Sequence, residues 1–292
     1  MAECSPSKCG KDSSCSTCSS SPKPLETAQA RAIKKTLRSI RSTLFVMSGK
    51  GGVGKSAVTV NLAVALAHEG LKVGVLDVDM HGPSIPSLFG IDDHLAPKDD
   101  EVLAPIYYRG EIAVISMDSL LANRDTAIIW RGPKKTVAIR QFIASVAWGD
   151  LDVLLIDSPP GTGDEHLAVL QAIPDAQCLM VTTPQEISLA DVRKALHFLE
   201  RTHANLMGIV ENMSGLSCPH CGAKIDLFSS GGGEKLAQSK NVPFLGRIPI
   251  DPVMLIAADS RCPLMDMPGE FPAKKAFQQI AQTVKKECFP DK

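Results

Sequence analysis

The sequence predicts an α/β fold of the doubly wound kind, in which helices cover both faces of a mainly parallel sheet. Short, continuous apolar runs alternate along the chain with segments whose apolar residues recur at helical spacing. Two of these runs end in carboxylates, at the strand ends where open α/β sheets bind their ligands. Apolar residues make up 44% of the 292 residues, which allows a large core and excludes wholesale disorder.

Each predicted element follows from its own pattern. The continuous apolar runs predict buried strands at 43–48, 72–79, 112–116, 152–157, 178–183 and 208–213. Apolar residues at helical spacing predict helices near 56–69, 134–147, 164–173, 188–203, 232–240 and 273–287. Residues 80–111 are mixed and rich in proline and aspartate, so they are expected to form a long loop or insertion.

The composition changes near residue 25 and divides the chain into three parts. Residues 1–24 are rich in serine and cysteine and hold no aromatic or branched aliphatic residue, which predicts a disordered tail with a candidate metal site. Residues 25–42 are basic with a helical pattern and predict a leading helix. Residues 43–288 form the main domain.

Charge and segment composition exclude several function classes. The net charge is −1, so a nucleic-acid partner that needs a strong basic field is not expected. No run of about 18 apolar residues is present, so no membrane span is expected. Residues 1–24 lack the apolar core of a secretory signal, which favours the cytoplasm. In that reducing compartment, clustered cysteines are more often metal ligands or redox groups than disulfides.

Residues 49–56 fit the phosphate-binding pattern G-x-x-x-x-G-K-[ST] between a predicted strand and a predicted helix. The glycines let successive backbone N–H groups point at phosphate oxygens, and the helix adds its positive dipole end. Lys55 is expected to reach the β- and γ-phosphates, and the Ser56 hydroxyl to bind Mg²⁺. The nucleotide-binding residues are therefore Gly49, Lys50, Gly51, Gly52, Val53, Gly54, Lys55 and Ser56.

Lys50 is a second lysine inside this loop. A cation there can neutralise charge as the γ-phosphate departs, as an arginine finger does. It can point away from the phosphate of its own subunit and, in a face-to-face dimer, reach the nucleotide of the partner. Spacing alone also allows a solvated loop lysine.

Carboxylates close two of the predicted strands. Asp157 ends the run 152–157 and is expected to hold Mg²⁺ as a Walker-B aspartate does. Asp77 and Asp79 close the run 72–79, and one of them is expected to orient the attacking water or to lie near Mg²⁺. The loop 158–164 holds two prolines and two glycines directly after Asp157, which favours a switch that responds to the γ-phosphate.

Cys218 and Cys221 form a Cys-x-x-Cys pair in a loop spanning 214–222. Three interpretations compete: a redox dithiol, half of a zinc site, and half of an iron–sulfur site. The Gly/Ser-rich context disfavours the redox dithiol, which needs a cysteine at a helix N-terminus. Because a zinc or iron–sulfur site usually has four protein ligands, a two-fold dimer would complete the site with two pairs. A site of four cysteine thiolates suits both zinc and an iron–sulfur cluster, so the residue types and their spacing do not distinguish the two.

These motifs together resemble the Mrp/ApbC family of P-loop ATPases over about residues 30–285. The resemblance rests on GKGGVGKS (49–56), DVDMHGPS (77–84), IDSPPGTGDE (156–165) and ENMSGLSCPHCG (211–222). It implies a P-loop NTPase fold of the deviant Walker A class, in which Lys50 is the signature lysine. It also implies a homodimer, or a heterodimer with a paralogue, with ATP near the interface and Asn212 at the adenine.

The resemblance further implies a carrier or scaffold for a labile [4Fe-4S] cluster, bridged by Cys218 and Cys221 of both subunits. The cluster would pass to apo iron–sulfur proteins, and ATP binding with slow hydrolysis would drive assembly or transfer. Eukaryotic cytosolic members of the family carry a second, N-terminal cluster site. Four cysteines are present here, but Pro24 stands where the family has its next cysteine, so adventitious metal binding is an alternative; they are Cys4, Cys9, Cys15 and Cys18.

Two rival functions remain at the sequence level. The first is a positioning ATPase of the septum or partition kind, whose membrane form needs an amphipathic C-terminal helix. Residues 273–287 do show an apolar stripe, but a surface helix packed on a sheet gives the same stripe more often. This rival also leaves Cys218 and Cys221 without a role. The second is a zinc-stabilised dimeric ATPase without a cluster.

Overall fold

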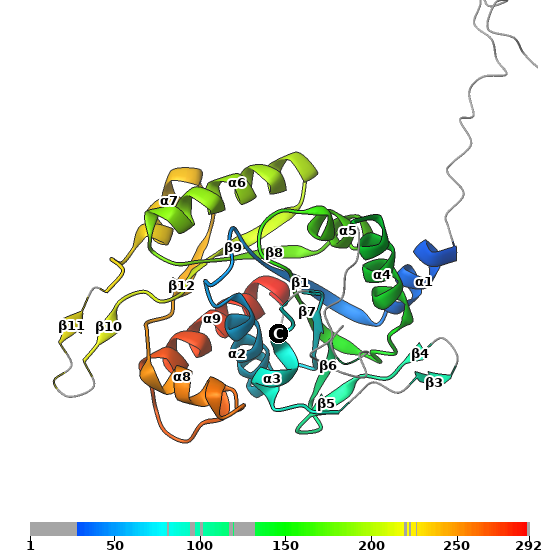
Figure 1. Cartoon of the computed structure of the whole chain (residues 1–292), viewed down its shortest axis with the longest axis horizontal. Coiled ribbons are helices and arrows are strands. Elements are labelled where there is room, and N and C mark those ends of the chain that lie inside the picture. Colours follow the sequence, from blue (N-terminus) through cyan, green and yellow to red (C-terminus); the bar gives the residue numbers. More distant parts are fainter. Residues whose placement is uncertain are drawn as a thin grey trace, which may run out of the picture.

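Eight strands form one sheet at the centre of the computed structural model (Figure 1). They are β1 (Ile40–Ser48), β2 (Val73–Asp77), β5 (Ile106–Tyr108), β6 (Ile112–Ser116), β7 (Leu151–Asp157), β8 (Gln177–Thr182), β9 (Asn205–Glu211) and β12 (Phe244–Arg247). Their order across the sheet is β12-β9-β8-β1-β7-β2-β6-β5. All neighbours are parallel except β5 and β6. The structure describes residues 28–80, 82–93, 97–99, 102–116, 119, 132–218, 221, 223–225 and 227–290.

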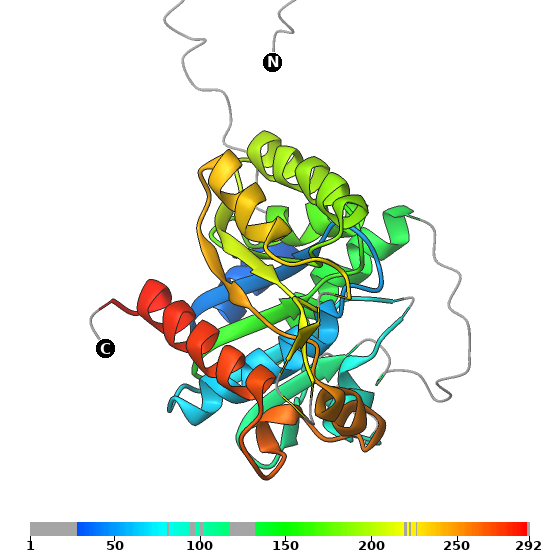
Figure 2. The ribbon, with the colours of Figure 1, turned by 90° about the vertical axis from the view of Figure 1, so that its left-hand side faces the viewer.

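Helices cover both faces of the sheet, as Figure 2 shows from the side. One face carries α2 (Lys55–His68), α3 (Ile85–Phe89), α8 (Pro252–Asp259) and α9 (Pro272–Cys288). The other carries α1 (Ala28–Leu37), α4 (Gly132–Ser145), α5 (Asp164–Ala172), α6 (Glu186–Thr202) and α7 (Gly232–Lys240). A short 3₁₀ helix, η3, spans Leu264–Asp266.

The strands alternate their side chains between two separate cores. In β1, Leu44 and Val46 face the core beneath α2 and α9, whereas Phe45 and Met47 face the core beneath α4 to α7. Both sets are fully buried. A strand buried on both faces has no polar positions, which is why the apolar runs in the sequence are continuous. The expected doubly wound fold with helices on both faces is confirmed.

The leading helix is shorter than the expected 25–42. It ends at Leu37, and β1 begins at Ile40 rather than at residue 43. Residues 40–42 pair with β7 through Ile40 and Leu151, and the Arg41 guanidinium contacts Asp152 at 2.9 Å. These contacts come from a strand about 110 residues away, so no local helical pattern reveals them.

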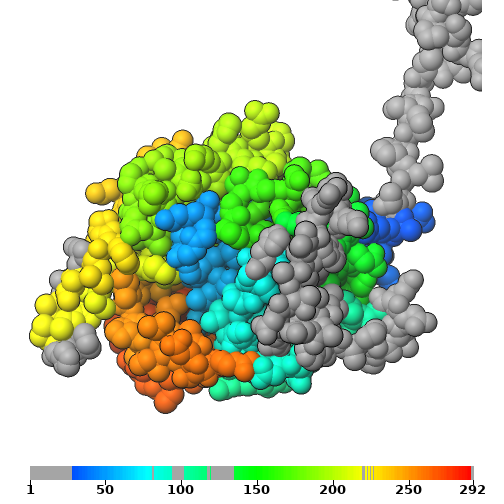
Figure 3. All heavy atoms as spheres, in the orientation of Figure 1, coloured from blue at the N-terminus to red at the C-terminus, as the bar shows by residue number. Residues whose placement is uncertain are grey.

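The segment 80–111 also differs from the loop that its composition predicts. It contains α3, the antiparallel edge strand β5, and the short pair β3 (Pro97–Asp99) and β4 (Val102–Leu103). A second short pair, β10 (Leu216–Ser217) and β11 (Lys224–Ile225), projects from the molecule beside α8 (Figures 1 and 3). The tail 1–24, with its four cysteines, lies outside the described residues.

The apolar stripe of α9 is covered by the fold. Phe277, Ile280 and Val284 are each at most 1% exposed and pack with residues of α2 and β12. The stripe therefore belongs to a surface helix packed on the sheet. No helix among the described residues is long and apolar enough to cross a bilayer.

Candidate functional site

The phosphate-binding loop joins β1 to α2, and its glycines are required by close approaches and by backbone conformation. Gly52 and Gly54 both have φ of 79°, in the left-handed region that favours glycine. A Cβ on Gly54 would lie 2.4 Å from the Asn212 amide nitrogen, and one on Gly49 would lie 2.6 Å from a main-chain carbon of Asp191. The loop can therefore take this path only with glycine at these positions.

The loop borders a pocket of about 320 Å³. The pocket walls outside the loop come from the ends of β1 and β2, from α3, and from the loop that follows β7. The lining residues are Ser48, Lys50, Gly51, Gly52, Val53, Gly54, Lys55, Ser56, Ala57, Asp79, Ser84, Leu88 and Pro160. Backbone N–H groups at a helix N-terminus, together with one buried lysine, make this pocket suited to polyphosphate.

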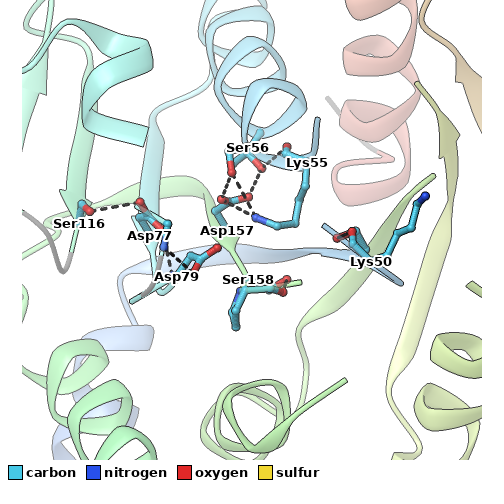
Figure 4. Close-up of polar contacts among 12 residues, drawn as sticks. Lys50, Lys55, Ser56, Asp77, Asp79, Ser116, Asp157 and Ser158 are labelled. Carbon is cyan, nitrogen blue, oxygen red and sulfur yellow. Dashed lines mark hydrogen bonds and ion pairs between the residues drawn. The ribbon is translucent and has the colours of Figure 1, made fainter. Parts of the chain in front are cut away.

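Asp157 is the centre of the polar contacts beside the pocket (Figure 4). Its Oδ2 lies 2.6 Å from the Lys55 Nζ and accepts a 2.6 Å hydrogen bond from the Ser56 hydroxyl. Its Oδ1 accepts a 2.7 Å hydrogen bond from the Thr59 hydroxyl. Thr59 was not expected at the site from the sequence, although it lies one helical turn after Lys55 and so shares its side of α2.

Asp77 and Asp79 lie at the end of β2, but their surroundings differ. Asp77 is fully buried, and its two oxygens accept hydrogen bonds from the Ser116 hydroxyl and the Asp79 amide. Burial, followed by the charge of Asp157, raises the pKa of Asp77 well above its ordinary range. Asp79 lines the pocket itself, and its Oδ1 accepts a hydrogen bond from the Gly82 amide at 3.2 Å.

Lys50 points away from the contacts around Asp157 (Figure 4). No described residue lies within ion-pair distance of its ammonium group. Its carbonyl accepts a hydrogen bond from the Ser48 hydroxyl at 3.0 Å, which fixes the backbone while the side chain extends outward. The Lys50 side chain therefore takes no part in the contacts around Asp157.

The loop 158–164 lies against the phosphate-binding loop. The Gly161 amide donates to the Ser48 carbonyl at 3.0 Å, and Pro160 forms part of the pocket wall. Where the loop enters α5, Glu165 is bound by Lys135 at 2.8 Å. The neighbouring His166 is fully buried against Phe45 and Phe198, and burial lowers its pKa to about 4.

Asn212 lies beneath the phosphate-binding loop. Its side-chain amide donates to the Val53 carbonyl at 2.9 Å, and its backbone N–H donates to the Thr182 carbonyl at 2.7 Å. It follows Glu211, the last residue of β9, and only 2% of it is exposed. Asn212 therefore ties the loop to the strand from which the cysteine hairpin leaves the fold.

Cys218 and Cys221 lie at the outer end of the hairpin formed by β10 and β11. Cys218 follows β10, is half-buried, and its amide donates to the Ala223 carbonyl at 2.9 Å, whereas Cys221 is exposed. Among the described residues, no group of three or more histidine, cysteine, aspartate or glutamate side chains is placed to hold a metal. Cys178 lies buried in β8, where burial raises the pKa of its thiol to about 12. Within the described part of the chain, the Cys218–Cys221 pair therefore offers two thiols, whereas zinc and iron–sulfur sites usually have four protein ligands.

Comparison with known proteins decides the family. A family model described as the ParA, NUBPL iron-transfer P-loop NTPase matches residues 39–285. The chain belongs to this family of iron-transfer NTPases. It is 46% identical over 263 residues to the human cytosolic Fe-S cluster assembly factor NUBP2, covering 88% of this chain and 96% of that protein. It is 45% identical over 287 residues to an iron-sulfur cluster carrier protein of Methanocaldococcus jannaschii, covering 97% and 98%.

Solved structures agree with the fold of this iron-transfer NTPase. A nucleotide-binding protein of Archaeoglobus fulgidus in complex with ADP, in which cobalt was found, is 40% identical. It superimposes with a TM-score of 0.71 over 84% of this chain and 98% of that one. The cell division ATPase MinD of Pyrococcus furiosus superimposes with a TM-score of 0.64 at 23% identity, over 84% and 99%, which shows the shared fold alone.

The structure gathers some of the expected site residues of this iron-transfer NTPase and separates others. Lys55, Ser56 and Asp157 are in direct contact, and Asp79 shares their pocket. Lys50 extends away from them, and the cysteine pair lies on a separate hairpin. Glu211, a buried carboxylate, was not expected at the site either. In the sequence, only its position directly before Asn212 pointed to it.

Proposed function

We propose that this NTPase is an ATP-hydrolysing carrier that binds a [4Fe-4S] cluster between two copies of the chain and delivers it to apo iron–sulfur proteins. The observation that carries the proposal is the Cys218–Cys221 pair on the projecting hairpin, which would supply half of the ligands of a cluster, in a chain that also holds a phosphate-binding pocket. The names of the human and archaeal relatives support an iron–sulfur cluster as the cargo, and "cytosolic" in the name of the human relative supports a cytoplasmic location. The ADP in the Archaeoglobus structure supports an adenine nucleotide.

In this proposal, the loop amides and Lys55 bind the phosphates of ATP. The Lys55 ammonium lies against Asp157, so phosphate oxygens would compete with that carboxylate for it. The Ser56 and Asp157 oxygens lie side by side next to the pocket, and such oxygen donors fit Mg²⁺. When bound, Mg²⁺ would neutralise charge on the phosphates.

Asp79 is the carboxylate that we assign to the attacking water. It lines the pocket, whereas Asp77 is fully buried and bonded to Ser116 and to the Asp79 amide. Asp77 thus positions the backbone of Asp79. Water attacks the γ-phosphorus, the bond to the bridging oxygen of ADP breaks, and a positioned carboxylate accepts the water proton.

The cysteines would hold the cluster as cargo. Thiolate ligands suit iron–sulfur clusters, and two Cys-x-x-Cys pairs related by a two-fold axis supply four of them. Exposure of Cys221 leaves the ligands open to an acceptor protein, which transfer requires. Lys50 would reach the nucleotide of the partner subunit in the same dimer.

Anaerobic reconstitution with iron and sulfide tests this proposal. The wild type should gain the visible absorbance of a cysteine-ligated cluster, one cluster per two chains, and transfer it to an apo acceptor. Cys218→Ala and Cys221→Ala should each lose that cluster, and Cys262→Ala, a half-buried cysteine outside the hairpin, should keep it. Zinc in place of iron in the purified protein, or a bridging cluster retained by both hairpin variants, would contradict the assignment.

A further inference from the structure

Glu211 lies at the base of the segment that carries the cysteine pair. The chain leaves the sheet after Glu211, runs out through β10, returns through β11, and re-enters the fold at α7. The Glu211 side chain is fully buried. A buried carboxylate destabilises the fold unless hydrogen-bond donors surround it. The donors of Glu211 therefore show which parts of the chain it holds together.

The donors come from both ends of this segment. At the outgoing end, the Ser214 hydroxyl donates to Glu211 Oε1 at 2.5 Å. At the returning end, the Gly231 amide donates to Oε1 at 2.8 Å and the Gly233 amide to Oε2 at 2.5 Å. One carboxylate therefore closes a loop of the chain whose outer part holds Cys218 and Cys221.

The glycines at the returning end are shaped to this carboxylate. Gly231 has φ of 78°, and a Cβ on Gly233 would lie 3.0 Å from Glu211 Oε2. Successive amides in such a turn form a concave anion site. Arg247 adds a cation 3.9 Å from Oε1, and its guanidinium also contacts Glu234 on α7.

The same strand end contacts the nucleotide-binding loop. Asn212, the next residue, donates to the Val53 carbonyl, and Met213 has φ of 56°, an uncommon conformation for a side-chain-bearing residue. If the loop shifts toward bound phosphates, it would move Asn212 through this hydrogen bond. Glu211 is the residue before Asn212, so the movement would also reach the carboxylate that holds both ends of the hairpin. The contacts thus run from the nucleotide-binding loop through Asn212 to Glu211 and both ends of the hairpin.

We propose that Glu211 is a positioning residue that couples nucleotide binding to the exposure of Cys218 and Cys221, by holding both ends of the cysteine hairpin to the strand end beside the nucleotide loop. The inference rests on the proposed function for the meaning of the two thiols as cluster ligands. Nucleotide binding changes the accessibility of the two thiols, and the Glu211 carboxylate transmits that change to the hairpin.

Thiol alkylation in the full chain, reduced and free of cluster, tests the coupling. Iodoacetamide labelling of Cys218 and Cys221, followed by mass spectrometry with and without ATP, should show rates that differ about fivefold or more in the wild type, the lower end of usual coupling. Glu211→Gln keeps the shape of the side chain but has one accepting oxygen instead of two, so it can accept from only one of the Gly231 and Gly233 amides. The effect of ATP on the labelling rates should therefore fall below about twofold while ATP still binds.

Glu234→Gln is the matched control, because it removes a carboxylate from the first turn of α7 and from Arg247 without touching the hairpin ends. It should keep the wild-type nucleotide effect. Ser214→Ala removes only the hydroxyl at the outgoing end and guards against a Glu211→Gln chain that fails to fold; it should reduce the effect.

Three results would overturn the coupling: a wild type whose two thiols react equally with and without ATP, a folded Glu211→Gln that keeps the full effect, or a Ser214→Ala that keeps it. Because the labelling needs no cluster, a failed reconstitution would reject the proposed function and leave this result standing. The reverse outcome, a bound cluster with thiols indifferent to ATP, would reject the coupling alone.

Discussion

Individual side chains around the nucleotide site show how burial, rather than sequence position, assigns roles. Asp77 and Asp79 are two residues apart at the end of one predicted strand, and the sequence pattern favours Asp77 only weakly as the residue that orients the attacking water. The structure encloses Asp77 completely and leaves Asp79 on the pocket wall. Asp77 accepts a hydrogen bond from Ser116 in the neighbouring strand β6, a contact between residues 39 positions apart that sequence position does not reveal.

His166 provides a residue-scale prediction about pH. Its ring is fully buried between Phe45 and Phe198, and burial lowers its pKa to about 4. An exposed histidine in the unfolded chain titrates near ~6.5. Between these values the unfolded state binds more protons, so acidification should lower the free energy of unfolding across pH 6.5 to 4, by up to about 3 kcal/mol.

His166→Phe should remove this part of the pH dependence, because phenylalanine fits the apolar site between Phe45 and Phe198 and takes up no proton. Urea unfolding at a series of pH values measures it. The same replacement at the exposed His197 serves as the control and should follow the wild-type curve. If His166→Phe loses stability on acidification as steeply as the wild type, burial does not set this pKa.

Among the elements, those with a long apolar run or a full helical repeat could be predicted from sequence, and those made by pairing could not. The strand β6 spans the expected 112–116, and α7 spans the expected 232–240. By contrast, β12 is four residues long and includes Gly246, so it contains no apolar run from which a strand could be predicted. The pairs β3–β4 and β10–β11 consist of two or three residues per strand, which have a defined conformation only because a partner strand is present.

The edge strand β5 gives an element-scale prediction. The Tyr108 hydroxyl donates to Asp266 Oδ2 at 2.7 Å and so ties this strand to η3 across 158 residues. Tyr108→Phe should destabilise the protein by about 1–2 kcal/mol, because Asp266 loses a donor in a largely buried site. Thermal unfolding should show a lower Tm. Tyr107→Phe, an exposed neighbour on the same strand, should leave the Tm unchanged; equal shifts in both variants would mean that the hydrogen bond contributes nothing.

At the scale of the whole molecule, the proposed dimer accounts for two features of the chain. The cysteine pair supplies two of the four ligands that a cluster needs, and Lys50 extends away from the contacts around Asp157. Sequence pattern located both features. It could not settle the direction of these side chains, because that direction depends on the folded backbone of each loop.

Mixing two inactive variants tests whether Lys50 acts across the dimer. Lys55→Ala should abolish ATP hydrolysis through lost phosphate binding, and Lys50→Ala should lower kcat by at least about 10²-fold with a smaller change in KM, as for a transition-state cation. In a mixed dimer, the Lys50→Ala chain keeps its own Lys55 and receives an intact Lys50 from the Lys55→Ala chain. One working site per mixed dimer should restore about a quarter of wild-type hydrolysis in an equal mixture, given a symmetric two-fold assembly. If Lys50 served its own subunit instead, neither chain could supply what the other lacks, and the mixture would be no more active than the two variants measured separately.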